Sequence, residues 1–474
     1  MQRVLEALHQ GDYDTAFETL VRTLTFAQGE AAKEASLLLA EAYTLYGEGG
    51  LEGAYRALEE GHEAYPDLEV HPRYRALLAE LRALEGASEG EVKSLLIEND
   101  DPQAQYHQAQ ALLYLGLPEE ALGVLERFLF AEEGTAPLAL PDFLAWRAHA
   151  LRGKAYERLG QPGEAALAYR EAAHRAMGLE RYWNLLDAAA MFVEAGAGEE
   201  ALEVLAEAGE NLSDPGLAAS AQPNTIIEDP EDAATRAYLE ARAHLLLGNP
   251  NRALKAIAQA LELEKQGAEP AHGTPLVQGQ ALMQLGQYQA AIEAFREAAA
   301  RAEDTDRTYA LHELGVASLE GGNAAEAETY LREVVRDPDY GYLGEAWGDL
   351  AETLYRQSRY DEARQAAQQA IELEALPAGH LILGHLAYDL LNLEEALEHY
   401  EIAAQEAPEG SRDWVSANEM VVDVLAQMGF VRPQEIVARA EALMPLLAES
   451  DDWRDTLQGY VERARTMLGG RTLN

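Results

Sequence analysis

Three basic residues, Arg147, Lys154 and Arg158, form the most distinctive group of chemically active side chains in this sequence. They are separated by seven and then by four residues, a spacing that places them on one face of a helix. Because guanidinium groups bind carboxylates through paired hydrogen bonds, the group predicts a binding site for an anion or for a C-terminal carboxylate. The alternative is an ordinary solvated helix surface.

The charge around this group contrasts with that of the whole chain. Seven basic and four acidic residues occupy positions 147–181, whereas the 474-residue chain has a formal charge of −47. A chain this acidic repels polyanions and anionic membrane surfaces, so nucleic acid is not an expected partner. No segment approaches the roughly 20 apolar residues of a membrane-spanning helix, so no membrane insertion is expected.

Other kinds of site chemistry find little support in the sequence. The absence of cysteine excludes disulfides, thiol nucleophiles and cysteine-ligated metals. Gly153-Lys154 is followed by Ala155 and so lacks the hydroxyl residue of a phosphate-binding loop. His380 and His385 are five residues apart, which is a poor spacing for metal ligands on one helical face. We therefore expect no cofactor, no metal and no enzymatic activity.

A short pattern recurs along the chain. It consists of a glycine or another turn residue, then acidic or polar residues, then an alanine. The alanines are mostly 33 to 38 residues apart and are Ala16, Ala121, Ala165, Ala201, Ala253, Ala291, Ala327, Ala363 and Ala396. Apolar residues with a period of 3.6 stand on both sides of each glycine, so each interval predicts a helix hairpin.

The interval around Gly160 shows how such a hairpin is encoded. Leu151, Ala155 and Leu159 form an apolar stripe on a first helix. Gly160 can adopt the left-handed conformation that ends this helix, and Pro162 is well placed to begin the next one.

These marks resemble the tetratricopeptide repeat family. One interval matches its pattern of small, aromatic and alanine positions at Gly153, Tyr156, Ala165, Tyr169 and Ala172, and another at Gly384, Ala396, Tyr400, Ala403 and Pro408. The resemblance covers almost the whole chain and implies an all-α, right-handed superhelical solenoid of about twelve antiparallel helix hairpins.

In the resembling family, the first helix of each repeat lines a concave groove. Carrying those positions over gives Tyr106, Tyr114, Arg147, Lys154, Arg158, Trp183, Tyr238 and Arg242 as candidate ligand-binding residues, and Glu345 and Glu352 further along. For the aromatic residues, the alternative is that they pack between neighbouring repeats.

Two departures from the repeat suggest how the chain is divided. Residues 213–235 contain Pro215, Pro223 and Pro230, which forbid a continuous helix and predict an insertion or hinge loop. The expected organisation is an N-terminal array (1–212), this loop, a C-terminal array (236–448) and a C-terminal capping helix (449–474).

The function that the sequence favours is a non-catalytic scaffold or adaptor that binds a peptide segment or a partner helix in its groove. The acidic background favours a basic or charge-mixed protein partner. The alternatives are a structural, self-assembling solenoid and an enzyme. The N-terminus lacks the features of a signal peptide, so we expect a cytoplasmic protein. Only five of the 36 basic residues are lysine, a coding bias that suggests a bacterial source.

Overall fold

The computed structural model describes residues 1–130, 140–212, 229–447 and 452–470. Helical residues make up 81% of this described part, and it contains no strand. The chain forms two compact units, residues 1–269 and 270–474. The all-α prediction is confirmed.

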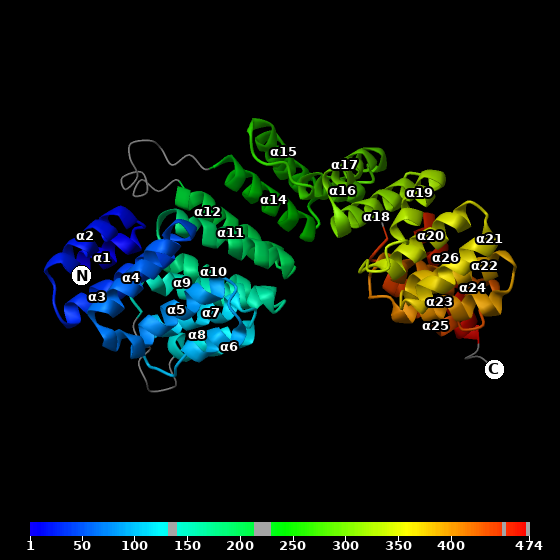
Figure 1. The fold of residues 1–474 in the computed structure, drawn as a ribbon. Coiled ribbons are helices and arrows are strands. Elements are labelled where there is room, and N and C mark those ends of the chain that lie inside the picture. The colour runs from blue at the N-terminus through cyan, green and yellow to red at the C-terminus, as the bar shows by residue number, and fades with distance from the viewer. Residues whose placement is uncertain (131–139, 213–228, 448–451, 471–474) are drawn as a thin grey trace. The chain divides into compact units, whose positions relative to one another are not determined.

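Within the described residues unit 1 contains seven hairpins, and the two helices of each hairpin pack against one another (Figure 1). Short 3-10 turns at Glu48–Gly50 and Pro66–Val70 flank the fourth helix. The helices are α1 (Gln2–His9), α2 (Tyr13–Phe26), α3 (Glu30–Tyr46), α4 (Leu51–Ala64), α5 (Pro72–Leu84), α6 (Glu89–Leu95), α7 (Pro102–Tyr114), α8 (Pro118–Leu129), α9 (Asp142–Arg158), α10 (Pro162–Arg175), α11 (Gly178–Glu194), α12 (Gly198–Leu212), α14 (Pro230–Leu246) and α15 (Pro250–Gln266).

Unit 2 contains five hairpins and one further helix, α26, which packs against α25. Counted over the described residues, the two units therefore hold twelve hairpins. The helices of unit 2 are α16 (Gly273–Gln284), α17 (Tyr288–Arg301), α18 (Asp304–Glu320), α19 (Ala324–Val334), α20 (Leu343–Arg356), α21 (Tyr360–Glu372), α22 (Leu376–Asp389), α23 (Leu393–Glu406), α24 (Arg412–Gln427), α25 (Pro433–Leu443) and α26 (Asp452–Gly470).

The predicted loop at 213–235 lies only partly within the described residues. Residues 213–228 are outside them, and α14 begins at Pro230, with the Asp229 carboxylate accepting a hydrogen bond from the Glu231 backbone amide at 3.0 Å. Residues 230–235 are therefore helical, which corrects the predicted extent of the loop. Proline suits this position because the first helical residue has no intrahelical use for its N–H. The compact units divide at a different place, between Glu269 and Pro270.

The turn at Gly160 has the predicted geometry. Gly160 has a φ of +67°, its amide donates to the Glu157 carbonyl, and the next amide donates to the Tyr156 carbonyl. These bonds satisfy carbonyls at the end of α9 that would otherwise lack partners. Helix α10 then begins at Pro162, so the predicted roles of this glycine and this proline are confirmed.

A glycine on the first helix and a large side chain on the second bring the helices of a hairpin into close contact. A Cβ atom on Gly153 would lie 2.8 Å from the Tyr169 ring, and one on Gly279 would lie 2.5 Å from the Phe295 ring. Gly384 has the same relation to Tyr400, at 2.6 Å. Each ring therefore occupies the space that a side chain on the first helix would need.

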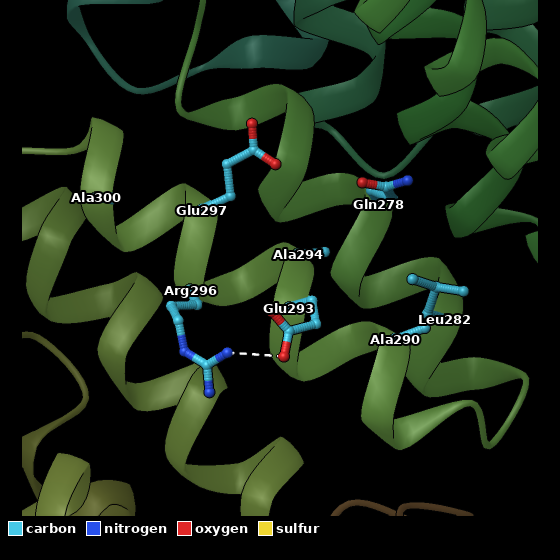
Figure 2. A pocket seen from close by; sticks show the side chains of 8 residues that line it. All are labelled: Gln278, Leu282, Ala290, Glu293, Ala294, Arg296, Glu297 and Ala300. Carbon is cyan, nitrogen blue, oxygen red and sulfur yellow. Dashed lines mark hydrogen bonds and ion pairs between the residues drawn. The ribbon is translucent and has the colours of Figure 1, made fainter.

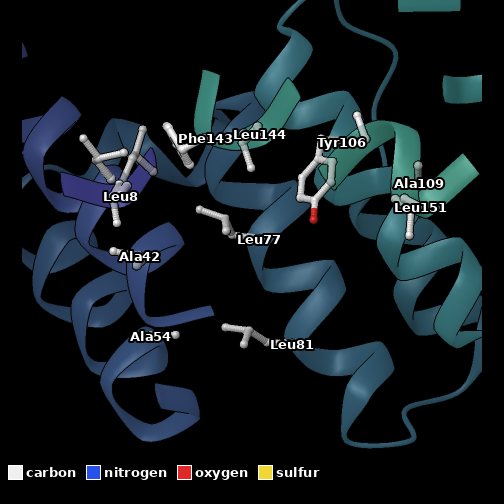
Figure 3. Packing of buried hydrophobic residues seen from close by; sticks show 14 of the residues in the cluster. Leu8, Ala42, Ala54, Leu77, Leu81, Tyr106, Ala109, Phe143, Leu144 and Leu151 are labelled. Carbon is white, nitrogen blue, oxygen red and sulfur yellow. The ribbon is translucent and has the colours of Figure 1, made fainter. Parts of the chain in front are cut away.

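The first five hairpins of unit 1 are arranged so that the first helix, α1, contacts α9 of the fifth hairpin. One apolar cluster runs through them and includes Leu8, Leu77, Leu81, Tyr106, Phe143 and Leu151 (Figure 3). Helices α3, α5 and α7, which are first helices of their hairpins, are consequently buried on nearly every side. Positions that line an open groove in a looser array are interior positions here.

Candidate functional site

Two of the three predicted cations on α9 bind other parts of unit 1. Arg147 donates hydrogen bonds to the Phe143 carbonyl at 2.5 Å and to the Tyr13 hydroxyl at 3.1 Å. Arg158 donates to the Leu113 carbonyl, in the last turn of α7. Both side chains therefore hold neighbouring helices together, a role that the spacing of the cations does not reveal.

Lys154 is the third predicted cation, and its side chain is exposed. It has no hydrogen bond or ion pair within the part of the chain that the structure describes. Its charge interacts with that of Asp187 on α11. Burial among protein atoms raises the pKa of this aspartate to about 6, and the charge of Lys154 opposes the rise. The Asp187 side chain nevertheless retains solvent access.

The predicted aromatic residues lie in different environments. Tyr106 is only 5% exposed, so it is a core residue and its prediction as a groove ligand is corrected. Tyr114 is 40% exposed and Trp183 is 42% exposed. The Trp183 indole donates to the Asp232 carboxylate at 2.9 Å. The physical reason for the correction is the α1–α9 contact, which encloses α7.

Tyr238 and Arg242 lie one turn apart on α14. The Arg242 guanidinium lies 5.8 Å from the centre of the Tyr238 ring and donates to the Glu194 carboxylate at 2.8 Å. The structure therefore does not gather the eight predicted residues into one site.

The enclosed helices of unit 1 carry a polar cluster that the sequence did not predict. His107 on α7 is fully buried, and its two ring nitrogens contact Glu41 on α3 at 2.9 Å and Glu80 on α5 at 2.5 Å. Burial alone would lower the pKa of His107. The charges and hydrogen bonds of Glu80 and Glu41 outweigh this and raise the pKa to about 9. The imidazolium thus neutralises buried carboxylates of two other helices.

Unit 2 contains a different kind of feature, an acidic cavity of about 250 Å³. It lies among α20, α22 and α24, the first helices of three consecutive hairpins. Its acidic lining residues are Glu345, Asp349, Glu352 and Asp413, and its other charged residue is Arg412. Two of these positions, Glu345 and Glu352, were identified by the resemblance. Asp349 lies on the same helix face, since Glu345, Asp349 and Glu352 stand at positions i, i+4 and i+7. This spacing could have identified Asp349 from the sequence.

The carboxylates of the acidic cavity are unequally paired. Asp349 contacts His312 at 2.9 Å, and Glu352 accepts from Arg356 at 2.5 Å. Glu345 and Asp413 have no hydrogen bond or ion pair within the described residues. Burial raises the pKa of Asp413, while the charge of Arg412 opposes that rise. The cavity therefore holds negative charge that its own side chains do not fully satisfy.

The other lining residues of the acidic cavity include apolar and neutral side chains. Leu381 and Ile382 are 7% and 4% exposed. His385 stacks on Tyr355 with ring centres 5.5 Å apart, and burial lowers its pKa, so this wall is uncharged at neutral pH. A cavity lined by both carboxylates and apolar side chains suits a side chain with an aliphatic stem and a cationic head.

A larger and more open hollow of about 700 Å³ lies between α16 and α17 (Figure 2). Its charges are satisfied internally, since Arg296 pairs with Glu293 at 2.7 Å and Glu297 pairs with Arg301 at 2.6 Å. Paired charges of this kind leave little to attract a ligand, so the acidic cavity is the better candidate site.

The described residues contain no helix with both the length and the apolar character needed to cross a membrane. They also contain no group of three or more histidine, aspartate or glutamate side chains arranged to hold a metal ion.

Comparison with known proteins agrees with the repeat architecture. The model of the tetratricopeptide repeat family matches residues 106–180, 276–341 and 346–411, which lie in both units. No curated protein matches the sequence.

Solved structures of similar proteins include three that span different shares of the chain. The Cut9–Hcn1 hetero-tetramer of the APC/C is 15% identical over 94% of this chain and 98% of that chain, with a TM-score of 0.38. PilF of Pseudomonas aeruginosa is 16% identical over 48% and 99%, with a TM-score of 0.37. YrrB, titled a TPR protein with an unusual peptide-binding site, is 20% identical over 37% and 87%, with a TM-score of 0.30.

Proposed function

We propose that this chain, which belongs to the tetratricopeptide repeat family, is a non-catalytic scaffold that binds a basic segment of a partner protein in the acidic cavity of unit 2. The observation that carries the proposal is the unsatisfied negative charge of the cavity. Glu345 and Asp413 have no hydrogen bond or ion pair within the described residues, and they line the cavity together with the apolar Leu381 and Ile382.

The size of the cavity supports a side chain as its occupant. Small-molecule sites usually enclose about 300–1,000 Å³, whereas this cavity has about 250 Å³. One long side chain of an extended partner fits such a volume. Complementary charge then supplies specificity and speeds association, as is typical of charged interfaces.

The α9 face formed by Arg147, Lys154 and Arg158 stays a second proposed surface, for an anionic segment of the same or another partner. It is less available than the sequence suggests, because Arg147 and Arg158 already hold neighbouring helices. Lys154 is the member of the group with a free ammonium in the described part of the chain. A cytoplasmic location, which the sequence favours, is part of this proposal.

The experiment is capture of partners by the full chain, followed by affinity measurement with each purified partner. The test variant is Glu345→Lys with Glu352→Lys. The control is Glu406→Lys with Glu462→Lys, which reverses two exposed glutamates of unit 2 that do not line the cavity. We expect the test variant to weaken binding about tenfold or more, because it places like charges against the ligand. The control variant should change the affinity for the partner little.

Equal affinities for the test and control variants would contradict the proposal. The mass at which the purified chain elutes distinguishes the proposed scaffold from the alternative of a self-assembling solenoid. A purified chain that elutes at several times 51.8 kDa and captures no distinct partner would favour assembly.

A further inference from the structure

The acidic cavity already contains one cation of the protein's own, Arg412. This arginine stands at the start of α24, and its guanidinium lies 2.9 Å from Glu320 at the end of α18. It also lies 3.6 Å from Glu352 on α20. One side chain thus reaches from the last of these helices to carboxylates two and three hairpins earlier in the chain.

This contact is weakly held. The Arg412 side chain remains 59% exposed, and exposed ion pairs contribute little to stability. Both of its acceptors also have another arginine, because Arg356 contacts Glu320 at 3.3 Å and Glu352 at 2.5 Å. Departure of Arg412 therefore leaves neither glutamate without a cationic partner.

The carboxylates around Arg412 can bind a further cationic group more tightly than they bind Arg412. Glu345 and Asp413 line the same cavity without hydrogen bonds of their own in the described residues. Aspartates and glutamates outnumber arginines around the cavity, and the position of Arg412 demonstrates that a guanidinium group is accommodated there. A guanidinium offers several donors in a planar fork, which matches carboxylates that approach from different helices.

We propose that Arg412 is a resident competitor for the cavity, and that an arginine side chain of the partner binds by displacing it from Glu320 and Glu352. The inference rests on the proposed function, since it needs the cavity to bind a basic segment. It adds the chemical identity of the key partner residue and implies that Arg412 lowers the affinity of the intact chain for that residue.

The test uses the full chain and a fluorescein-labelled peptide, Gly-Ser-Leu-Arg-Leu-Ser-Gly with blocked ends. Matched peptides carry lysine or citrulline in place of the arginine, and citrulline keeps the shape without the charge. Binding is followed by fluorescence anisotropy at low ionic strength, because salt screens exposed charges. The protein variants are Arg412→Gln and Arg412→Lys.

The control variant is Arg465→Gln. Arg465 is 61% exposed and has one ion pair with Glu441 at 2.5 Å, so this change removes the same charge from the same unit at a similar exposure. We expect Arg412→Gln to bind the arginine peptide about three- to tenfold more tightly than the intact chain, by removal of an exposed competitor. Arg412→Lys and Arg465→Gln should stay close to the intact chain. The citrulline peptide should bind weakly to all of them.

Several results would overturn the inference. If Arg412→Gln and Arg465→Gln bind the peptide equally, or if Arg412→Gln binds it more weakly, displacement is wrong. In that case loss of binding by Glu345→Gln with Glu352→Gln would still support the proposed function, so the two failures are distinguishable. A lysine peptide that binds as tightly as the arginine peptide would overturn the assignment of the partner residue to arginine.

Discussion

The Nε2 atom of His107 lies 2.9 Å from the carboxylate of Glu41, which is 66 residues earlier in the chain, and both side chains are completely buried. A second carboxylate, Glu80, approaches Nδ1 at 2.5 Å. Arg73 lies nearby and pairs with Glu34 at 2.9 Å and with Asp101 at 3.5 Å. Three successive first helices of unit 1 are therefore joined by a network of buried charges.

The first prediction concerns the pH dependence of unit 1. The pKa of His107 is raised from 6.5 to about 9 in the folded chain, so its contribution to stability is complete below about pH 6.5 and is lost as the pH rises through 9. We expect the free energy of unfolding of this unit to fall by about 3 kcal/mol over that range. Denaturant titrations between pH 6 and 10 measure it.

The controls for this prediction are two histidine variants. His107→Gln should remove the fall, while His272→Gln should leave it, because His272 belongs to unit 2 and its side chain is 40% exposed. Identical slopes for the intact chain and His107→Gln would show that another group is responsible.

A second prediction concerns the independence of the hairpins. Ala291 is fully buried where α17 crosses α16, so Ala291→Leu should overpack this crossing and cost about 1–3 kcal/mol. Hydrogen exchange should show lost protection around α16 and α17, because α17 packs mainly against its neighbours α16 and α18. Its neighbour Ala290 is exposed, so Ala290→Leu should change little. Uniform loss of protection across the chain would contradict the repeat picture.

A third prediction uses a turn that lacks the usual glycine. Leu391 follows α22 and has a φ of +58°, a left-handed backbone conformation that is strained for a residue with a side chain. Its side chain is 80% exposed, so burial does not offset this strain. Leu391→Gly should stabilise unit 2 by about 0.5–1 kcal/mol through relief of this strain. The preceding Leu390 is also exposed but has a φ of −82°, so Leu390→Gly should destabilise instead. Thermal unfolding of both variants decides the matter, and a loss of stability in Leu391→Gly would refute the strain argument.

A fourth prediction tests the α9 surface. Replacement of Arg147, Lys154 and Arg158 by alanine should weaken binding of an acidic partner segment, since charged hydrogen bonds contribute about 1.5–3 kcal/mol each. The same change should lower the stability of unit 1 by about 1–3 kcal/mol, because Arg147 and Arg158 make contacts to Tyr13 and Leu113. Lys154→Ala alone separates these effects, because it should affect binding without affecting stability. A partner whose affinity is indifferent to all three changes would remove α9 from the binding surface.

The repeat architecture was predictable because its signals are local. The alanine of each hairpin, the left-handed Gly160 and the initial Pro162 all lie within a few residues of the turn that they encode. The enclosure of Tyr106 was not predictable in this way. It depends on contacts such as that between Arg147 and Tyr13, which are 134 residues apart and show no pattern in the sequence.

The candidate site was predictable only in part for a similar reason. Glu345, Asp349 and Glu352 share one helix face and could be grouped from their spacing alone. Arg412 and Asp413 belong to another hairpin, and only the curvature of unit 2 brings them to the same cavity. The sequence shows the charges, but it does not show which of them face one another.

The contact between Gly153 and Tyr169 has a consequence for how such a chain can change in length. The same sixteen-residue interval separates Gly279 from Phe295 and Gly384 from Tyr400, so each of these three hairpins carries its own alignment contact. A single-residue insertion inside one interval therefore misaligns one hairpin, and the error does not propagate to the rest. Duplication or deletion of an entire hairpin leaves these intervals intact in the remaining hairpins, so the number of repeats can change without altering the packing inside any one of them.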